Sequence, residues 1–135
     1  MPVSPTTSSY EFTRDDFVLN PHQAIVASYT LDQDYVTEET LVDGESRKIL
    51  RAGTIVAMNP SDDTIVPNYT TYGFGELGIL YQDADTEDGD AVVPVVLEAE
   101  VKEDVLVDNG TYGTVLAATK TALSGRVTFH KSNRL

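Results

Sequence analysis

Residues 76–106 read ELGILYQDADTEDGDAVVPVVLEAEVKEDVL, and this stretch decides the expected fold. An apolar segment at 77–81 is followed by an acidic turn and then by residues 91–101, the longest apolar run of the chain. Short runs that are rich in β-branched residues and bounded by turn residues predict β-strands. Pro94 removes one donor from the hydrogen-bond ladder, so we expect it at an edge or at a bulge of the sheet.

Further strand signals lie on the N-terminal side of this stretch. Residues 23–31, 54–58 and 64–66 are rich in β-branched residues, and polar or proline-containing segments bound them. Residues 37–48 are polar, and the turn signal Asp43-Gly44 within them predicts an exposed hairpin tip or a loop. On the C-terminal side, Asn109-Gly110 is the best tight-turn dipeptide of the chain.

Residues 114–123, TVLAATKTAL, are the only convincing helical segment. Thr114 is the expected N-cap, Gly125 suits the stop, and one apolar face is expected from Val115, Leu116, Thr119 and Leu123. Many short strands with one short C-terminal helix predict a β-rich α+β fold.

The size and composition favour one small domain. A chain of 135 residues with 41% hydrophobic content has room for a single compact core. It contains no cysteine, so disulfides, thiolate catalysis and cysteine zinc sites are excluded. Neither a membrane-spanning apolar run nor a signal peptide is present in this sequence, so we expect synthesis in a cytoplasm and no membrane partner.

The charge is strongly negative and unevenly distributed. The chain carries 22 acids and 9 bases, a net charge of -13, which opposes nucleic-acid binding because that affinity depends on clustered Lys and Arg. Residues 83–108 contain ten acids and one lysine, whereas the last ten residues contain three bases and no acid. This distribution indicates either a solvated acidic face alone or an acidic outer face with a less acidic face that docks on a partner.

The N-terminal residues predict an extended arm. Residues 2–9, PVSPTTSS, lack apolar periodicity and contain two prolines, so they cannot bury enough surface to fix themselves and are biased toward extended conformations. Tyr10, Phe12 and Phe17 follow, and these aromatics are expected to anchor the arm in this chain or in a neighbour. We therefore divide the chain into an arm at 1–18 and a β-rich domain at 19–135.

Chemical signatures are weak throughout the sequence. The acidic turn resembles a calcium loop at first, but the positions of its glycine and of its acids do not fit an EF-hand. His22 and His130 are far apart and lack metal-binding spacing, and no nucleophile motif is present. The sequence therefore disfavours an enzyme and predicts neither a cofactor nor a metal.

Several short motifs carry a resemblance to a known family. Gly78-Ile79-Leu80 leads through a polar turn to a long strand and then to Glu103-Asp104-Val105-Leu106, while Ala52-Gly53-Thr54 lies upstream. Residues 120–125 and 126–129 match a short helix, a glycine and a last strand. In this order the motifs resemble the lambda-type head decoration proteins of tailed bacteriophages over roughly residues 49–129, and residues 32–48 depart from the smallest members.

The resemblance implies a β-tulip-like fold and a structural role on the outer surface of the virion. It implies a homotrimer at three-fold and quasi-three-fold positions of an expanded phage head, with the major capsid protein as partner and the arm pairing with its strands. The capsid-binding residues are then those of the arm, Pro2, Val3, Ser4, Pro5, Thr6, Thr7, Ser8, Ser9, Tyr10 and Phe12. Two alternatives stay open: a carbohydrate- or calcium-binding β module on a viral or cell surface, and a small β enzyme.

Overall fold

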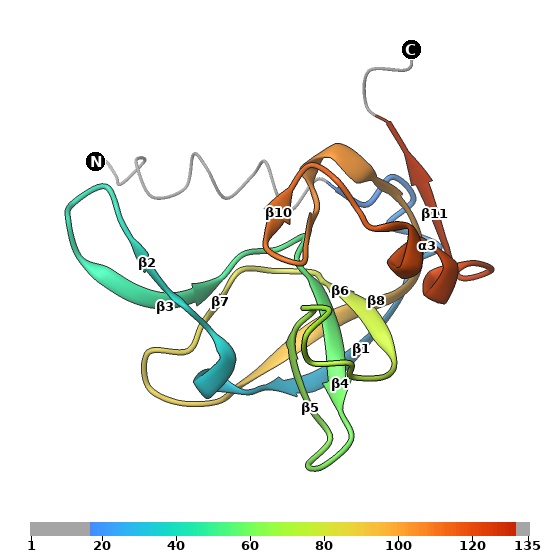
Figure 1. Ribbon diagram of the computed structural model, residues 1–135. Helices are drawn as coiled ribbons and strands as arrows, with labels where there is room; N and C mark the ends of the chain where they lie inside the picture. Colours follow the sequence, from blue (N-terminus) through green and yellow to red (C-terminus); the bar gives the residue numbers. More distant parts are fainter. Residues whose placement is uncertain (1–16, 132–135) are drawn as a thin grey trace.

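The computed structural model describes residues 17–131 (Figure 1). Within them the chain is a small strand-rich domain with one short α-helix near the C-terminus, so the expected α+β class is confirmed. The elements are β1 (Ile25–Leu31), the 3-10 turn η1 (Gln33–Tyr35), β2 (Glu38–Thr40), β3 (Ser46–Leu50), β4 (Ile55–Asn59), β5 (Thr64–Pro67), β6 (Leu77–Leu80), β7 (Ala84–Asp85), β8 (Ala91–Lys102), η2 (Glu103–Val105), β9 (Val107–Asp108), β10 (Thr111–Tyr112), α3 (Ala117–Leu123) and β11 (Val127–His130).

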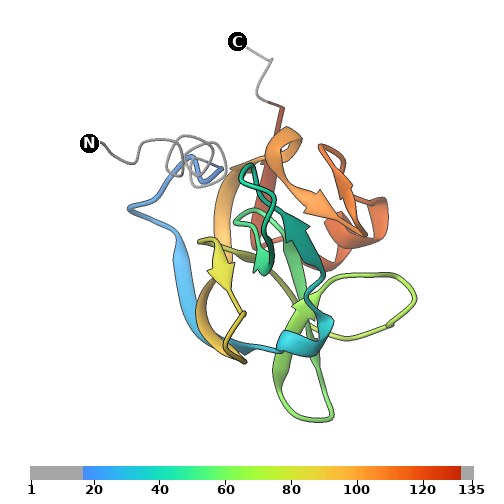
Figure 2. The ribbon, with the colours of Figure 1, turned by 90° about the vertical axis from the view of Figure 1, so that its left-hand side faces the viewer.

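Five strands close into a ring. The order is β1-β5-β4-β6-β8, and β8 pairs back with β1, while β11 adds to β8 in parallel. The closure is weakest between β1 and β5, which are parallel and in register at one pair, Leu31 opposite Ile65. The ring and the long curved β8 are visible in the turned view of Figure 2. Closing a sheet in this way reduces the number of strand edges that are exposed to other chains.

The strands of the ring separate two apolar clusters. Neighbouring residues in a strand point to opposite faces of a sheet. Leu80 and Val95 belong to one cluster, while their neighbours Ile79 and Val96 belong to the other. The first cluster draws on all five ring strands and therefore fills the ring. The second lies outside it, between the sheet and the C-terminal segment, and includes Phe17, Leu106, Val115, Leu123 and Val127.

Gly78 allows the strands of the ring to approach closely. A Cβ at this position would lie 2.5 Å from Cγ1 of Val95 and 3.2 Å from the carbonyl oxygen of Val96. Because Val95 and Val96 belong to the buried core, neither can move without disturbing its neighbours. The glycine of the Gly-Ile-Leu motif is therefore a packing requirement of β6 against β8.

Pro94 lies neither on an outer strand nor at a bulge, so that prediction was wrong. It stands opposite Ser28 in the regular part of the β1–β8 ladder, whose irregularity falls between Ile25 and Val26. The carbonyl of Pro94 accepts from the N–H of Tyr81 at 3.0 Å, just past the end of β6. The nitrogen and the carbonyl oxygen of a strand residue point to the same side of the strand. The nitrogen of Pro94, which carries no hydrogen, therefore points to the β6 side, where β6 has already ended and none of its residues needs a donor.

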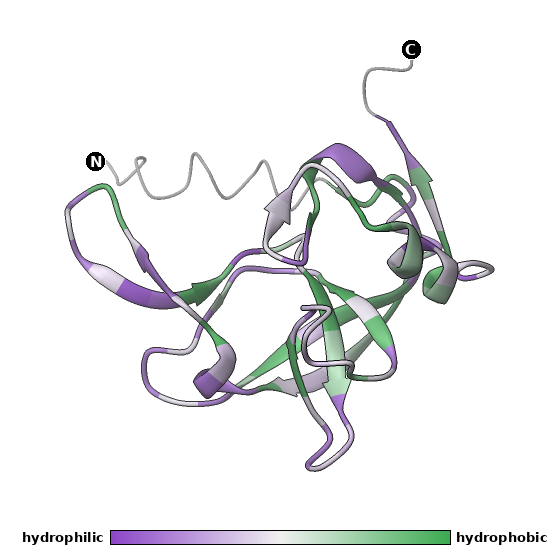
Figure 3. Cartoon of the chain, viewed as in Figure 1, coloured by the Kyte–Doolittle hydropathy of each residue, from purple (hydrophilic) through white to green (hydrophobic). Residues whose placement is uncertain are grey.

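The polar segment 37–48 forms a hairpin. β2 and β3 are antiparallel with Thr40 opposite Ser46, and Gly44 has φ +90° in the turn, so the hairpin alternative was correct. Figure 3 shows this hairpin as largely hydrophilic and the ring strands as largely hydrophobic. Arg51 connects the hairpin to the segment between β6 and β7, because its guanidinium binds Glu39 of β2 and, at 2.9 Å, Asp83.

The C-terminal helix begins later than its sequence pattern predicts. Asn109-Gly110 forms the expected turn between β9 and β10, with φ of 52° and 77°. The helix α3 then starts at Ala117, so Thr114 is not the N-cap, and Leu116 in that place caps no amide with its side chain. The buried carboxylates of Glu103 and Asp108 accept from the N–H groups of Val115 and Leu116 before the helix.

Candidate functional site

The predicted capsid-binding residues, 2–9 with Tyr10 and Phe12, lie outside the described part of the chain. Of the aromatics expected to anchor the arm, Phe17 is described. It is fully buried, and its ring meets the ring of Tyr81 edge-on with centroids 6.2 Å apart. Phe17 therefore anchors the start of the domain within this chain, which the sequence alone left open.

Both ends of the described chain lie beside the last residues of β8. The N–H of Lys102 donates to the carbonyl of Phe17 at 2.8 Å, and the N–H of Leu19 donates to the carbonyl of Glu100 at 2.8 Å. On the other side of β8, β11 runs in parallel with His130 opposite Lys102. The segment that follows the arm and the last strand thus leave the domain on either side of the same strand (Figure 1).

The C-terminal part of the chain is richer in bases than the rest. After Asp108 the sequence contains no acid and four bases, of which Lys120, Arg126 and Lys131 are described. Lys120 and Lys131 have side chains that are 40% and 52% exposed. Leu19, in the segment before β1 and on the other side of β8, is an exposed apolar residue. We call the surface formed by Leu19, Lys102, Lys120, His130 and Lys131 the terminal face.

Glu103 is the electrostatic centre beneath the terminal face. Its side chain is 3% exposed, yet Oε1 lies 2.9 Å from Nζ of Lys120 and 3.2 Å from Nζ of Lys131, and Oε2 accepts from the N–H of Val115 at 3.1 Å. Burial opposes ionisation, but these three donors outweigh it and hold the pKa of Glu103 below its ordinary value. The carboxylate therefore joins the end of β8 to α3 and to the end of β11.

The motifs that carry the family resemblance meet at one junction. Gly53, with φ +89°, donates its N–H to the carbonyl of Leu80 at 2.8 Å and accepts from the N–H of Val107 at 3.0 Å. A Cβ at Gly53 would lie 3.1 Å from the carbonyl oxygen of Val105. The Ala-Gly-Thr, Gly-Ile-Leu and Glu-Asp-Val-Leu segments are thus in direct contact, although the first and last of them are about fifty residues apart in sequence.

The carboxylates of the acidic turn hold other parts of the chain. Asp85 pairs with Arg47 at 2.7 Å, and the amide of Glu87 together with this guanidinium lowers the pKa of Asp85. The remaining contacts run from Asp83 to Arg51 and the amide of Ala52, from Glu87 to the amide of Lys48, and from Asp90 to the amide of Gln33. Across residues 17–131, no group of three His, Cys, Asp or Glu side chains could hold a metal ion.

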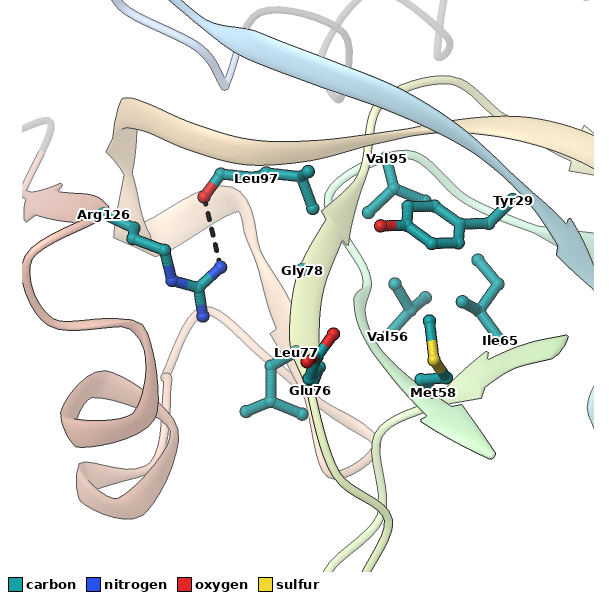
Figure 4. Close-up of a pocket in the computed structure, with 10 residues that line it drawn as sticks. All are labelled: Tyr29, Val56, Met58, Ile65, Glu76, Leu77, Gly78, Val95, Leu97 and Arg126. Atoms are coloured by element: carbon teal, nitrogen blue, oxygen red, sulfur yellow. Dashed lines mark hydrogen bonds between the residues drawn. The ribbon is translucent and has the colours of Figure 1, made fainter. Parts of the chain in front are cut away.

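A pocket of about 350 Å³ opens at one mouth of the ring (Figure 4). Most of its lining residues are apolar, but its exposed surface is about half polar, and its polar side-chain groups are the hydroxyl of Tyr29, the carboxylate of Glu76 and the guanidinium of Arg126. The volume is at the lower end of the range of small-ligand pockets. The lining residues are Tyr29, Val56, Met58, Ile65, Glu76, Leu77, Gly78, Val95, Leu97 and Arg126.

Sequence reasoning missed this pocket and the role of Glu103. Tyr29, Glu76 and Arg126 lie far apart in the chain, and no spacing rule connects them. Glu103 is noticeable in the sequence only as part of a resemblance motif, because its partners Lys120 and Lys131 follow much later. These residues come together only when the strands close into a ring, and a sequence pattern does not show that closure.

Comparisons of this chain with known protein families, with curated proteins and with solved structures found no match. Within the described residues, no helix is long and apolar enough to cross a membrane.

Proposed function

We propose that this chain is a structural virion protein that binds the outer surface of an expanded phage head as trimers and stabilises the capsid lattice. The observation that carries the proposal is the junction at Gly53. Short apolar motifs can match a family by chance, and the buried segments of one small domain commonly touch. Here the three motifs share backbone hydrogen bonds and close packing, as the common fold that the resemblance implies would require.

The terminal face supports the same role. The arm joins the domain at Phe17, on one side of the end of β8, and Lys131 follows β11 on the other side. Leu19 and the two lysines Lys120 and Lys131 are exposed at this face. A partner that receives the arm would therefore meet a face that carries lysines and an apolar side chain beside the paired acids Glu100 and Glu103, so it could present groups of either charge. In this proposal the arm adds a strand to a sheet of the major capsid protein through main-chain hydrogen bonds.

The physical mechanism needs no catalysis. A protein that bridges several capsid subunits makes its full set of contacts only when those subunits are correctly spaced. It therefore stabilises the expanded lattice by mass action, because it binds that state in preference to the unexpanded one. The bound state is expected to be a trimer, and the negative net charge should oppose tight self-association of the free protein in low salt.

The test is co-sedimentation with purified phage heads that lack the protein. We expect binding to expanded heads, little binding to unexpanded heads, and a bound copy number that is a multiple of three at each occupied site. Sedimentation of the free protein should give monomer or weak trimer, with salt favouring assembly. Absence of binding to expanded heads, or a stable dimer at every salt concentration, would contradict the proposal.

A further inference from the structure

One edge of β1 is open. On one side, β1 pairs with β8 along its whole length, from Ile25 to Leu31. On the other side it meets β5 only where Leu31 stands opposite Ile65. Among the described residues no strand pairs with residues 25–30 on that second side. A strand edge of this length is a template for an added strand.

The direction of the backbone groups along this edge follows from Pro94. Because the carbonyl of Pro94 points to Tyr81, the pair of Pro94 and Ser28 exchanges no hydrogen bond across the β1–β8 ladder. The N–H and C=O of Ser28 therefore point away from β8. By alternation Val26 also presents its N–H and C=O outward, whereas Ala27 and Tyr29 turn theirs toward β8.

The pocket at the mouth of the ring lies directly beside this edge. Tyr29 projects from β1 into the pocket, and Met58 and Ile65 line it from β4 and β5 (Figure 4). The pocket therefore occupies the place where β1 and β5 have separated. Side chains alternate along a strand, so a strand added to β1 would direct every second side chain toward the pocket.

The pocket is lined by one charge of each sign, and Glu76 is the one that lacks a partner among the described residues. The guanidinium of Arg126 already donates to the carbonyls of Leu97, at 3.5 Å, and of Ala122, at 3.3 Å. The carboxylate of Glu76 is exposed and, within residues 17–131, has no hydrogen-bond or ion-pair partner. In Figure 4, Arg126 lies on one side of Gly78, with Tyr29 and Met58 on the other. The net charge of -13 also attracts cations over long range.

We propose that the open edge of β1 accepts an extended segment of a partner polypeptide, and that this segment places a lysine or arginine side chain in the pocket. The aliphatic stem of that side chain packs against Tyr29, Met58 and Ile65, and its charge meets Glu76. Long basic side chains are suited to such a site, because they bury an apolar stem while the charged end stays at the rim. This site is separate from the terminal face, and the inference does not rest on the proposed capsid role.

A randomised heptapeptide library tests this specificity with the full-length protein. We expect enrichment of Lys or Arg at one position, flanked by β-branched residues, and a selected peptide should bind E76Q about tenfold more weakly. E45Q is the matched control, since it removes the same charge from the exposed hairpin turn and should bind as the unchanged protein does. Selection without a basic preference, or equal weakening by E76Q and E45Q, would overturn the proposal.

Amide hydrogen exchange tests the strand pairing without a mutation that could affect folding. In the free protein the amides of Val26 and Ser28 should exchange quickly and those of Ala27 and Tyr29 slowly. Bound peptide should then protect Val26 and Ser28 at least tenfold. Uniform protection of all four amides in the free protein, or exchange that the peptide leaves unchanged, would show that the edge accepts no strand.

Discussion

The ammonium group of Lys120 lies 2.9 Å from Oε1 of Glu103, a carboxylate whose side chain is almost completely buried. A buried carboxylate is stable in its charged form only when donors replace the water that it has lost. Lys131 and the amide of Val115 supply the remaining contacts. The ionised state of Glu103 therefore stabilises the attachment of α3 and β11 to the end of β8.

This arrangement predicts a specific loss of stability in acid. The pKa of Glu103 in the folded protein lies below its ordinary value of 4.5, so its contribution is complete above pH 4.5 and is lost as the pH falls further, through the folded-state pKa. The variant E103Q should lose about 1–3 kcal/mol in the free energy of unfolding at pH 7, because a buried charge-assisted contact is removed.

Denaturant unfolding of both proteins between pH 3 and pH 7 measures this effect. The difference between E103Q and the unchanged protein should shrink as the pH falls below 4.5. E98Q is the control, since Glu98 is exposed on β8, the strand that directly precedes Glu103. A stability difference for E103Q that is independent of pH would mean that packing, and not the charge, is what the substitution removes.

Gly78 and Gly75 offer a matched pair of substitutions that tests the packing of the ring. G78A would place a methyl group 2.5 Å from Cγ1 of Val95, and overpacking of this kind costs about 1–3 kcal/mol. At Gly75 a Cβ meets nothing within 4 Å, so G75A should change the free energy of unfolding by less than about 0.5 kcal/mol.

A double-mutant cycle can localise the cost. V95A removes the atom that the new methyl group would strike, so G78A should be less destabilising in the V95A background than alone. Thermal or denaturant melts of the four proteins provide the measurement. Additive effects of G78A and V95A would show that these two residues do not meet in the folded protein.

Local sequence predicted the strands well but not their closure into a ring. Residues 54–58 and 64–66 read as strands because their β-branched runs end at turn residues, and β4 and β5 follow them closely. By contrast, the position of Pro94 in the longest strand could not be predicted locally. Pro94 is tolerated there because the neighbouring strand β6 ends beside it, and the sequence around Pro94 does not show where β6 ends. The start of α3 also differs from the prediction, since the buried carboxylates of Glu103 and Asp108, from the segment that precedes the helix, bind the amides of Val115 and Leu116.

The pocket and the open edge of β1 illustrate what remains beyond a linear pattern. Tyr29 reads as an ordinary strand residue, and Glu76 as one acid among many. Their shared pocket exists because β1 and β5 separate after a single pair of residues. The point at which β1 and β5 separate depends on how all five strands of the ring are arranged. The strand propensity of residues near Tyr29 or Glu76 therefore cannot predict it.

The acidic turn is expected to bind no structural calcium. Four of its five carboxylates are already committed to Arg47, Arg51 and backbone amides, so a calcium ion would have to break these contacts before it could be coordinated. Thermal melts in millimolar calcium and in chelator should coincide. A shift of several degrees between the two melts would favour the calcium-binding β module instead.

Deletion of residues 2–9 should separate folding from binding. Their composition is too polar and too rich in proline to contribute to a core, and the described domain is anchored from Phe17 onward, so the melting temperature should change little. Binding to expanded heads should fall strongly. A main-chain hydrogen bond contributes about 0.5–1.5 kcal/mol net, so two lost bonds, about 2 kcal/mol, weaken each contact some thirtyfold, and the effect multiplies when three arms bind together.

The occupancy of expanded heads by full-length and truncated protein, measured beside their melts, is the deciding comparison. A third variant, F17A, gives the opposite profile, because removal of a fully buried aromatic ring costs about 3–5 kcal/mol of stability while the sequence of residues 2–9 stays intact. Equal occupancy by the full-length and truncated proteins would remove the arm from the proposed binding mechanism. A truncated protein that melts as early as F17A would show instead that residues 2–9 belong to the folded core.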